Sequence, residues 1–252
     1  SIITTNSYSC TTPRLKRFNL ENEFKNLQRL ALRAAKEAIL EIGLNNNVKI
    51  AGCFSPLPGS YFKDKSISKK EMIETYLSIG ELQKDDVDFF IIETMSSIDE
   101  AVNAVEALSN FDKKILLCFC LSEGDGTKLF SGEDLSKACD LIQIDKISGL
   151  CLNCSQFEDI SIGLDILKKY GLPFGALPNN FQSVKPLKLG MSVDNIKKRN
   201  DILIEDFVNY SDIWLKKGCT ILGGCCEITP DYINGLNQFL MKNKYNKVNF
   251  FN

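Results

Sequence analysis

The chain alternates short apolar runs with amphipathic segments along its whole length. Seven apolar runs have the length and composition of buried strands, at residues 2–5, 48–53, 87–92, 114–121, 149–153, 174–177 and 220–222. Segments with helical periodicity follow them, at residues 22–42, 69–83, 97–108, 132–142, 157–169, 202–217 and 231–242. Residues 122–132 are rich in Gly, Asp and Ser and predict a loop. Strict alternation of strand and helix predicts a parallel α/β sheet covered by helices.

Two parallel architectures fit this alternation. A closed eight-stranded barrel takes about 250 residues, and this chain has 252. A doubly wound open sheet of seven strands is the alternative. No composition break marks a second domain, and no initiator methionine precedes Ser1. We therefore expect an α/β TIM (β/α)8 barrel whose first strand is missing from this chain, forming a single, N-terminally incomplete barrel domain over residues 1–252.

Composition excludes several classes of function. A net charge of -2 provides no general attraction to nucleic acid, and no apolar run is long enough to span a bilayer. No signal peptide is recognisable, so we expect a cytoplasmic protein. Several of the ten cysteines lie inside predicted strands, which favours reduced thiols. The chain has no histidine, so a Ser-His-Asp or Cys-His catalytic group is excluded and any metal site must use sulfur or carboxylate.

Two adjacent cysteines, Cys225 and Cys226, follow the last apolar run. Gly223 and Gly224 precede them and predict a sharp backbone turn. Neighbouring side chains of a strand point to opposite faces, so the two thiols can face one centre only where the chain leaves the strand. The pair could bind a metal, since thiolate is a preferred ligand of zinc. It could also be two small buried residues or a redox pair.

Other polar or soft residues also stand where strands end. Glu93 follows the run 87–92, and Cys154 follows the run 149–153. Because the functional residues of a barrel lie at the carboxyl ends of its strands, we expect both near the cysteine pair. Only one predicted strand, 174–177, separates the strand before Cys154 from the strand before Cys225 and Cys226. The three sulfurs are therefore expected to be close enough to bind one metal ion. For Glu93, a simple role as a hydrogen-bond acceptor in a loop remains open.

Several further residues have two interpretations. Asp125 and Asn179 are of types that usually serve turns. Four aromatic residues could face a cationic ligand, because aromatic faces attract such groups, although most residues at such spacing belong to the core. They are Tyr8, Phe54, Tyr61 and Trp214.

A set of short motifs covers essentially the whole chain. The most specific are Leu152-Asn153-Cys154, Gly223-Gly224-Cys225-Cys226 and Thr229-Pro230. The supporting ones are Thr5-Asn6-Ser7-Tyr8, Ala51-Gly52-Cys53 with Ser55-Pro56, residues 88–94 with Glu100-Ala101, and Asp125-Gly126-Thr127. Together they resemble the homocysteine S-methyltransferase family, zinc-dependent thiol methyltransferases that include betaine-homocysteine methyltransferase and the homocysteine domain of methionine synthase.

The resemblance implies a TIM barrel, a Zn²⁺ ion and small-molecule substrates, with no nucleic acid or membrane partner. The implied metal ligands are Cys154, Cys225 and Cys226, and the implied substrate-binding residues are Glu93, Asn153 and Ser55. No catalytic side chain beyond the zinc site is implied. The implied reaction moves a methyl group from an onium donor, preferably S-methylmethionine or S-adenosylmethionine, to the zinc-bound thiolate of homocysteine, giving methionine. A non-catalytic or remnant zinc-binding barrel is the alternative, as is the same chemistry with betaine or another donor.

Overall fold

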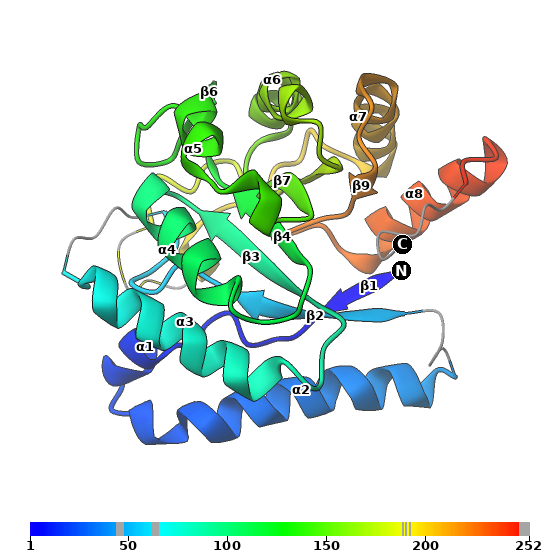
Figure 1. Ribbon diagram of the computed structural model, residues 1–252. Helices are drawn as coiled ribbons and strands as arrows, with labels where there is room; N and C mark the ends of the chain where they lie inside the picture. Colours follow the sequence, from blue (N-terminus) through cyan, green and yellow to red (C-terminus); the bar gives the residue numbers. More distant parts are fainter. Residues whose placement is uncertain (44–47, 62–65, 188, 190, 192, 247–252) are drawn as a thin grey trace.

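A seven-stranded parallel sheet forms the centre of the protein (Figure 1). The computed structural model describes residues 1–43, 48–61, 66–187, 189, 191 and 193–246. In spatial order, the strands of the sheet are β1 (Ile2–Thr4), β2 (Lys49–Phe54), β3 (Phe89–Met95), β4 (Ile115–Phe119), β7 (Gly149–Asn153), β8 (Phe174–Leu177) and β9 (Ile221–Leu222). All seven predicted strands are therefore present, although β9 is only two residues long.

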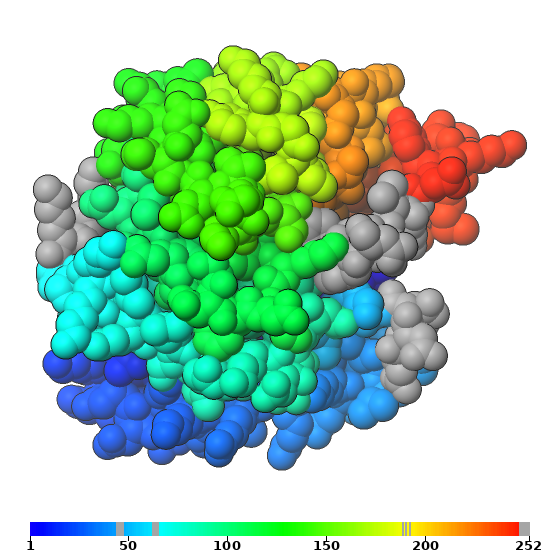
Figure 2. Space-filling model, in the orientation of Figure 1, coloured from blue at the N-terminus to red at the C-terminus, as the bar shows by residue number. Residues whose placement is uncertain are grey.

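Eight α-helices lie in the described part of the chain. They are α1 (Thr12–Lys16), α2 (Phe24–Glu41), α3 (Lys69–Gln83), α4 (Ile98–Leu108), α5 (Leu135–Leu141), α6 (Phe157–Leu167), α7 (Ile204–Lys217) and α8 (Pro230–Lys242). Helix α8 packs on α7 and projects from the rest of the surface (Figure 2). Within the described ranges, no helix combines the length and apolarity that crossing a bilayer requires.

The winding of the chain distinguishes the two expected architectures. The strands of the sheet follow one another in space in the same order as in the sequence. Each helix from α2 to α7 contacts the next helix along the chain, and these helices lie outside the curved sheet (Figure 1). A doubly wound sheet would instead reverse its strand order at a switch point. The protein is thus a parallel α/β sheet curled into a half-barrel, with β1 and β9 at its two edges.

Both faces of the sheet are buried. Phe90 and Ile92 of β3 belong to the main core between the sheet and the helices. Phe89 and Ile91 point to the other face, where they pack in a separate cluster on the inner side of the curve. Burial on both faces is the physical reason for the continuous apolar run at 89–92, as predicted for a parallel sheet covered by helices. Asp88, inside the predicted strand, is exposed and precedes β3.

The expected loop at 122–132 is wrong in part, because the chain forms an antiparallel hairpin there. Its strands are β5 (Leu121–Ser122) and β6 (Asp125–Leu129). Gly124 turns the chain with a φ of 82°, which glycine adopts without steric cost. The following helix, α5, begins at Leu135, three residues later than the expected 132.

Gly175 of β8 allows the edge strand β9 to approach closely. It pairs with Ile221, and a Cβ atom at residue 175 would lie 2.0 Å from the Ile221 carbonyl oxygen. We therefore expect Gly175→Ala to lower the free energy of unfolding by roughly 1–3 kcal/mol, the usual cost of overpacking. Urea denaturation measures this change. Equal urea midpoints for Gly175→Ala and the wild type would contradict this close approach of β9.

Candidate metal centre

Three sulfur atoms meet at the carboxyl edge of the sheet. The Sγ atom of Cys154 lies 3.7 Å from that of Cys226, and the Sγ atoms of Cys225 and Cys226 are 4.0 Å apart. All three sulfurs lie within 4.8 Å of one another. The structure therefore brings together the three cysteines that the sequence singled out, from two strand ends separated by about 70 residues of chain.

The geometry of the cluster fits a metal ion. Zinc–sulfur bonds of about 2.3 Å in a tetrahedral arrangement place sulfurs about 3.8 Å apart. The separations of the Cys226 sulfur from those of Cys154 and Cys225, 3.7 and 4.0 Å, are close to this value. Three thiolates with a fourth corner open for substrate are the pattern of a catalytic zinc site rather than a closed structural one.

Backbone contacts hold the cysteines at this edge. Cys154 follows β7 directly, and its N–H donates to the carbonyl oxygen of Leu177 in β8 at 2.9 Å. Its φ is 49°, a left-handed conformation that costs a non-glycine residue about 1–2 kcal/mol. The Cys225 N–H donates to the Pro178 carbonyl oxygen at 2.8 Å. These bonds tie both cysteine segments to the strand between them.

The two glycines before the cysteine pair act through close packing. Neither has a positive φ, and the left-handed residue of this turn is Glu227, with a φ of 64°. A Cβ atom at Gly224 would lie 2.2 Å from Cγ2 of Ile228, and one at Gly223 would lie 2.9 Å from Cδ2 of Leu177. The expectation that the glycines supply a sharp turn is therefore corrected: they let neighbouring side chains pack against the backbone.

Hydrogen bonds among the thiols separate their pKa values. Bonds from Cys154 and Cys225, which favour the thiolate, lower the pKa of Cys226 to about 4. Donating to Cys154 and Cys226, together with burial, raises the pKa of Cys225 well above its usual range. For Cys154, the hydrogen bond accepted from Cys225 lowers the pKa. Donation to Cys226 and burial have the larger combined effect, and the pKa of Cys154 rises to about 12. Binding of a metal to all three sulfurs would therefore release protons.

Glu93 shares the electrostatic environment of the cluster. It lies inside β3, whose pairing with β4 is irregular between Ile92 and Met95, so the expected strand end at Ile92 is three residues early. The Cys53 thiol lies 2.9 Å from Oε1 of Glu93 and donates to it. Burial raises the pKa of Glu93 to about 7, the bond from Cys53 opposes the rise, and the charge of Cys154 adds to it. A carboxylate so placed can accept a hydrogen bond from a cationic group.

Asn153 connects β7 with β3. Its Oδ1 accepts from the Thr94 N–H at 2.8 Å, and its Nδ2 donates to the Thr94 hydroxyl at 3.0 Å. Thr94 has a left-handed φ of 63° directly after Glu93, so Asn153 helps to hold the strand end that carries the carboxylate. That Asn153 also contacts substrate remains a prediction.

Asn153→Ala leaves the buried Thr94 N–H without its acceptor. We expect the free energy of unfolding to fall by about 1–3 kcal/mol, the cost of an unsatisfied buried polar group. Thr94→Ala removes the hydroxyl but keeps the bond to the backbone, so it should cost less. Chemical denaturation of both variants measures the difference, and equal losses would contradict this role of Asn153.

The remaining residues singled out from the sequence lie in different places. Ser55 is buried and donates to the Tyr8 carbonyl oxygen at 2.6 Å, and its substrate role remains a prediction. Phe54 and Trp214 belong to the main core. Asn179 serves a turn as expected, since its Oδ1 accepts from the Phe181 N–H at 3.1 Å, and it is also buried with Nδ2 4.0 Å from the Cys154 sulfur.

Two contacts, one to the cysteine cluster and one to Glu93, were not predicted from the sequence. The Tyr61 hydroxyl lies 2.8 Å from the Cys154 sulfur, and Cys53 donates to Glu93. The motif around Cys53 was visible in the sequence, but nothing local indicated what either side chain would touch.

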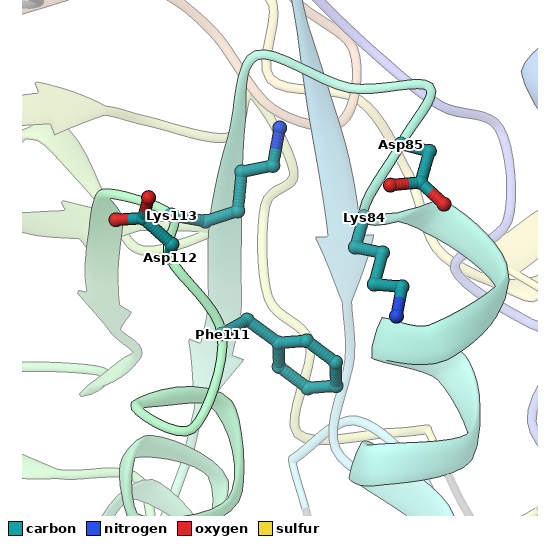
Figure 3. Close-up of a pocket in the computed structure, with 5 residues that line it drawn as sticks. All are labelled: Lys84, Asp85, Phe111, Asp112 and Lys113. Carbon is teal, nitrogen blue, oxygen red and sulfur yellow. The ribbon is translucent and has the colours of Figure 1, made fainter.

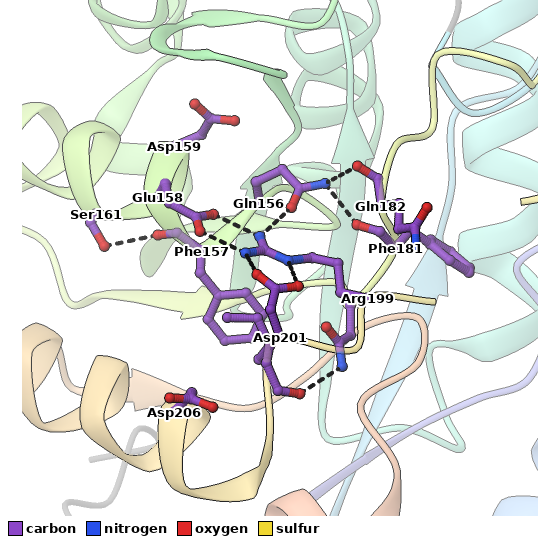
Figure 4. A network of polar contacts seen from close by, with 12 residues as sticks. Gln156, Phe157, Glu158, Asp159, Ser161, Phe181, Gln182, Arg199, Asp201 and Asp206 are labelled. Atoms are coloured by element: carbon purple, nitrogen blue, oxygen red, sulfur yellow. Dashed lines mark hydrogen bonds and ion pairs between the residues drawn. The ribbon is translucent and has the colours of Figure 1, made fainter. Parts of the chain in front are cut away.

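Arg199 anchors the chain between β8 and α7 to the start of α6 (Figure 4). Its guanidinium donates to both carboxylate oxygens of Glu158, each at 2.8 Å, and to Gln156 at 2.7 Å. The Arg199 N–H donates to the Asn180 carbonyl oxygen at 2.8 Å, and the Asn180 N–H donates to the Cys226 carbonyl oxygen at 3.0 Å. The first turn of α6 is thereby linked to the backbone of a cluster cysteine.

A surface cavity of about 300 Å³ lies at the other end of the strands (Figure 3). Its lining comes from the segments that lead into β3 and β4: Lys84, Asp85, Phe111, Asp112 and Lys113. Because functional residues of such sheets lie at the carboxyl ends of the strands, the cysteine cluster is the candidate site and this cavity is not.

A parallel sheet wound in one direction, with three thiols gathered at its carboxyl edge, defines a class of α/β half-barrel proteins with a candidate thiolate metal centre. The model of one family, homocysteine S-methyltransferase, matches residues 1–240. The chain belongs to the homocysteine S-methyltransferase family.

Curated relatives agree with this assignment. The chain is 27% identical over 169 residues to homocysteine S-methyltransferase 2 of Arabidopsis thaliana, covering 65% of this chain and 48% of the relative. It is 28% identical over 160 residues to selenocysteine methyltransferase of Astragalus bisulcatus, covering 61% of this chain and 45% of the relative. The chain thus spans about half the length of these relatives.

The fold is also that of a solved bacterial structure. The metallated form of the homocysteine methyltransferase MmuM from Escherichia coli superposes with a TM-score of 0.73 at 21% identity, covering 94% of this chain and 78% of that one. At this identity the likeness concerns the fold alone.

Proposed function

We propose that this protein is a zinc-dependent methyltransferase that moves a methyl group from an onium donor to the sulfur of homocysteine, giving methionine. The observation that carries the proposal is the convergence of the Cys154, Cys225 and Cys226 sulfurs within 4.8 Å at the carboxyl edge of the sheet. Membership of the homocysteine S-methyltransferase family supports the reaction class.

The chemistry follows from the donor set. Zinc held by these three sulfurs would supply positive charge that favours the deprotonated form of an incoming thiol. The homocysteine sulfur then forms a bond to the methyl carbon, and the bond between that carbon and the donor heteroatom breaks, its electron pair remaining on the donor. The thiol proton goes to solvent. No side chain has to act as a general base, which agrees with a chain that lacks histidine.

Glu93 would hold the ammonium group of homocysteine. Its carboxylate stands near the carboxyl end of β3, at the same edge of the sheet as the three sulfurs. An ammonium bound there would form a charge-assisted hydrogen bond, stronger than a neutral one. Binding one end of the substrate at Glu93 and the other at the cysteine cluster would fix the sulfur for attack. Asn153 and Ser55 are included in the proposal as neighbouring substrate-binding residues.

The donor we propose is S-methylmethionine or S-adenosylmethionine. A relative that matches 88% of this chain at 25% identity is the S-methylmethionine–homocysteine S-methyltransferase of Pongo abelii. Another, at 27% identity, is betaine–homocysteine S-methyltransferase 1 of Bos taurus, which keeps betaine as an alternative. The selenocysteine methyltransferase among the relatives adds selenocysteine as an acceptor to be tested.

Two broader proposals accompany this function. We propose that an eighth strand between β1 and β9 closes the half-barrel into a (β/α)8 barrel, because these edges are the two ends of a singly wound sheet. We place the protein in the cytoplasm, where a reducing environment keeps three clustered thiols available for a metal.

The test has two stages. Zinc bound to the purified protein is measured after expression in zinc-containing medium, and about one ion per chain is expected. Methionine formation from homocysteine is then measured with S-methylmethionine, S-adenosylmethionine and betaine, and selenocysteine is offered as a second acceptor. A metal-free protein would overturn the proposal, and a zinc-bound protein without turnover would favour a non-catalytic zinc-binding barrel.

A further inference from the structure

Tyr61 reaches the candidate metal centre from the segment after β2. Its hydroxyl oxygen lies 2.8 Å from the Cys154 sulfur, and its side chain is buried. The ring packs against that of Phe130, with centroids 5.3 Å apart. A metal-bound thiolate has no proton to donate, so the Tyr61 hydroxyl would be the donor in this hydrogen bond.

The segment that carries Tyr61 is held in place from several sides. Arg14 donates two hydrogen bonds to the Pro56 carbonyl oxygen, at 3.2 and 2.7 Å. The hydroxyl of Ser60, directly before Tyr61, lies 2.7 Å from the Tyr8 hydroxyl. Tyr61 itself has a left-handed φ of 64°, a conformation that costs a bulky residue energy. This conformation persists because the surrounding contacts hold it.

A second donor approaches the same sulfur. The Oδ1 atom of Asn179 accepts from the Phe181 N–H at 3.1 Å, which turns its Nδ2 toward Cys154, 4.0 Å from the sulfur. Both Asn179 and Phe181 are buried. The Cys154 sulfur is thus approached by two hydrogen-bond donors from outside the cysteine cluster, the Tyr61 hydroxyl and the Asn179 amide, in addition to its contact with Cys226.

We propose that Tyr61 is a positioning residue of the metal centre: its hydroxyl donates to the Cys154 thiolate, fixes the direction of that sulfur and withdraws charge from it. This inference rests on the proposed zinc function and deepens it. Groups that hydrogen-bond to metal ligands orient the ligand and tune the metal, and their loss typically costs about 10–100-fold in metal affinity. Less charge on Cys154 would leave the ion a stronger acceptor for a fourth sulfur.

Tyr61→Phe tests this role because it removes the hydroxyl and keeps the ring on Phe130. Zinc affinity is measured by competition with a chromogenic chelator, and we expect the dissociation constant to rise roughly 10–100-fold. The chain loaded with Co²⁺ gives a second measurement, its sulfur-to-cobalt absorption. Loss of a hydrogen bond raises the energy of the sulfur electrons, so this band should move to longer wavelength in Tyr61→Phe.

Tyr76→Phe is the matched control. Its side chain is also buried, but its hydroxyl donates to the Ser55 carbonyl oxygen at 3.1 Å and not to a cysteine of the cluster. It should change zinc affinity by less than about threefold and leave the cobalt band in place. Wild-type protein that binds metal while Tyr61→Phe matches it in affinity and spectrum would overturn the inference and leave the proposed function standing. Wild-type protein that binds neither metal would overturn both.

Discussion

Replacing Cys226 with serine should abolish zinc binding and methionine formation together. Its sulfur lies 3.7 Å from that of Cys154 and 4.0 Å from that of Cys225. Even a group that only hydrogen-bonds to a ligand contributes about 10–100-fold to metal affinity, so loss of a ligand should cost more than about 100-fold. Zinc per chain after dialysis, measured by atomic absorption, and methionine formation with the preferred donor provide the two readouts.

Cys10→Ser is the control for this substitution. Cys10 is a free, half-buried cysteine outside the cluster, so the same chemical change there should leave zinc content and turnover as in the wild type. If Cys226→Ser retained one zinc per chain with wild-type affinity, the three-sulfur site would be wrong.

Replacing Glu93 with glutamine should separate substrate binding from metal binding. Loss of a hydrogen bond to a charged group costs about 1.5–3 kcal/mol, which corresponds to roughly a 10- to 150-fold rise in KM for homocysteine. The amide oxygen can still accept from Cys53, so the side chain should stay in place and zinc content should not change. Steady-state kinetics over a range of homocysteine concentrations measures the effect. A wild-type KM in Glu93→Gln would remove Glu93 from the substrate site.

The raised pKa of Glu93 adds a pH dependence to this prediction. With a pKa of about 7, the carboxyl group loses its charge as pH falls through neutrality, and affinity for the substrate ammonium should fall with it. In Glu93→Gln this contribution is absent, so the decline of homocysteine affinity between pH 8 and 6 should be less steep than in the wild type. Parallel profiles for the two proteins would contradict the assignment.

The same shift affects stability in the opposite direction. A folded-state pKa of about 7, above the ordinary 4.5, means that the folded protein holds the Glu93 proton more tightly than the unfolded chain. The resulting stabilisation is complete below about pH 4.5 and is lost as pH rises through 7. Glu93→Gln should therefore gain stability relative to the wild type between pH 5 and 8, as measured by urea midpoints. A substitution that weakens substrate binding while stabilising the fold at pH 8 is the expected combination.

Much of the fold was predictable because its determinants are local. Burial on both faces of β3 produces the continuous apolar run at 89–92, and the amphipathic pattern of 22–42 appears as α2. The hairpin β5–β6 was not predicted, since its strands are short and its burial pattern irregular. The helix after it was expected three residues early, because Ser131 and Gly132 resemble a helix start although the cap residue is Asp134.

The strand–helix alternation and the candidate ligands, Cys154, Cys225 and Cys226, could be predicted from the sequence, because periodicity and residue type are properties of the chain. The approach of Tyr61 and Asn179 to Cys154, and the burial that raises the pKa of Glu93, are seen only in the folded protein. These features depend on distances between segments far apart in the chain, set by the curvature of the sheet and by loop contacts such as that of Arg14 with Pro56. Local sequence patterns carry no information about such distances.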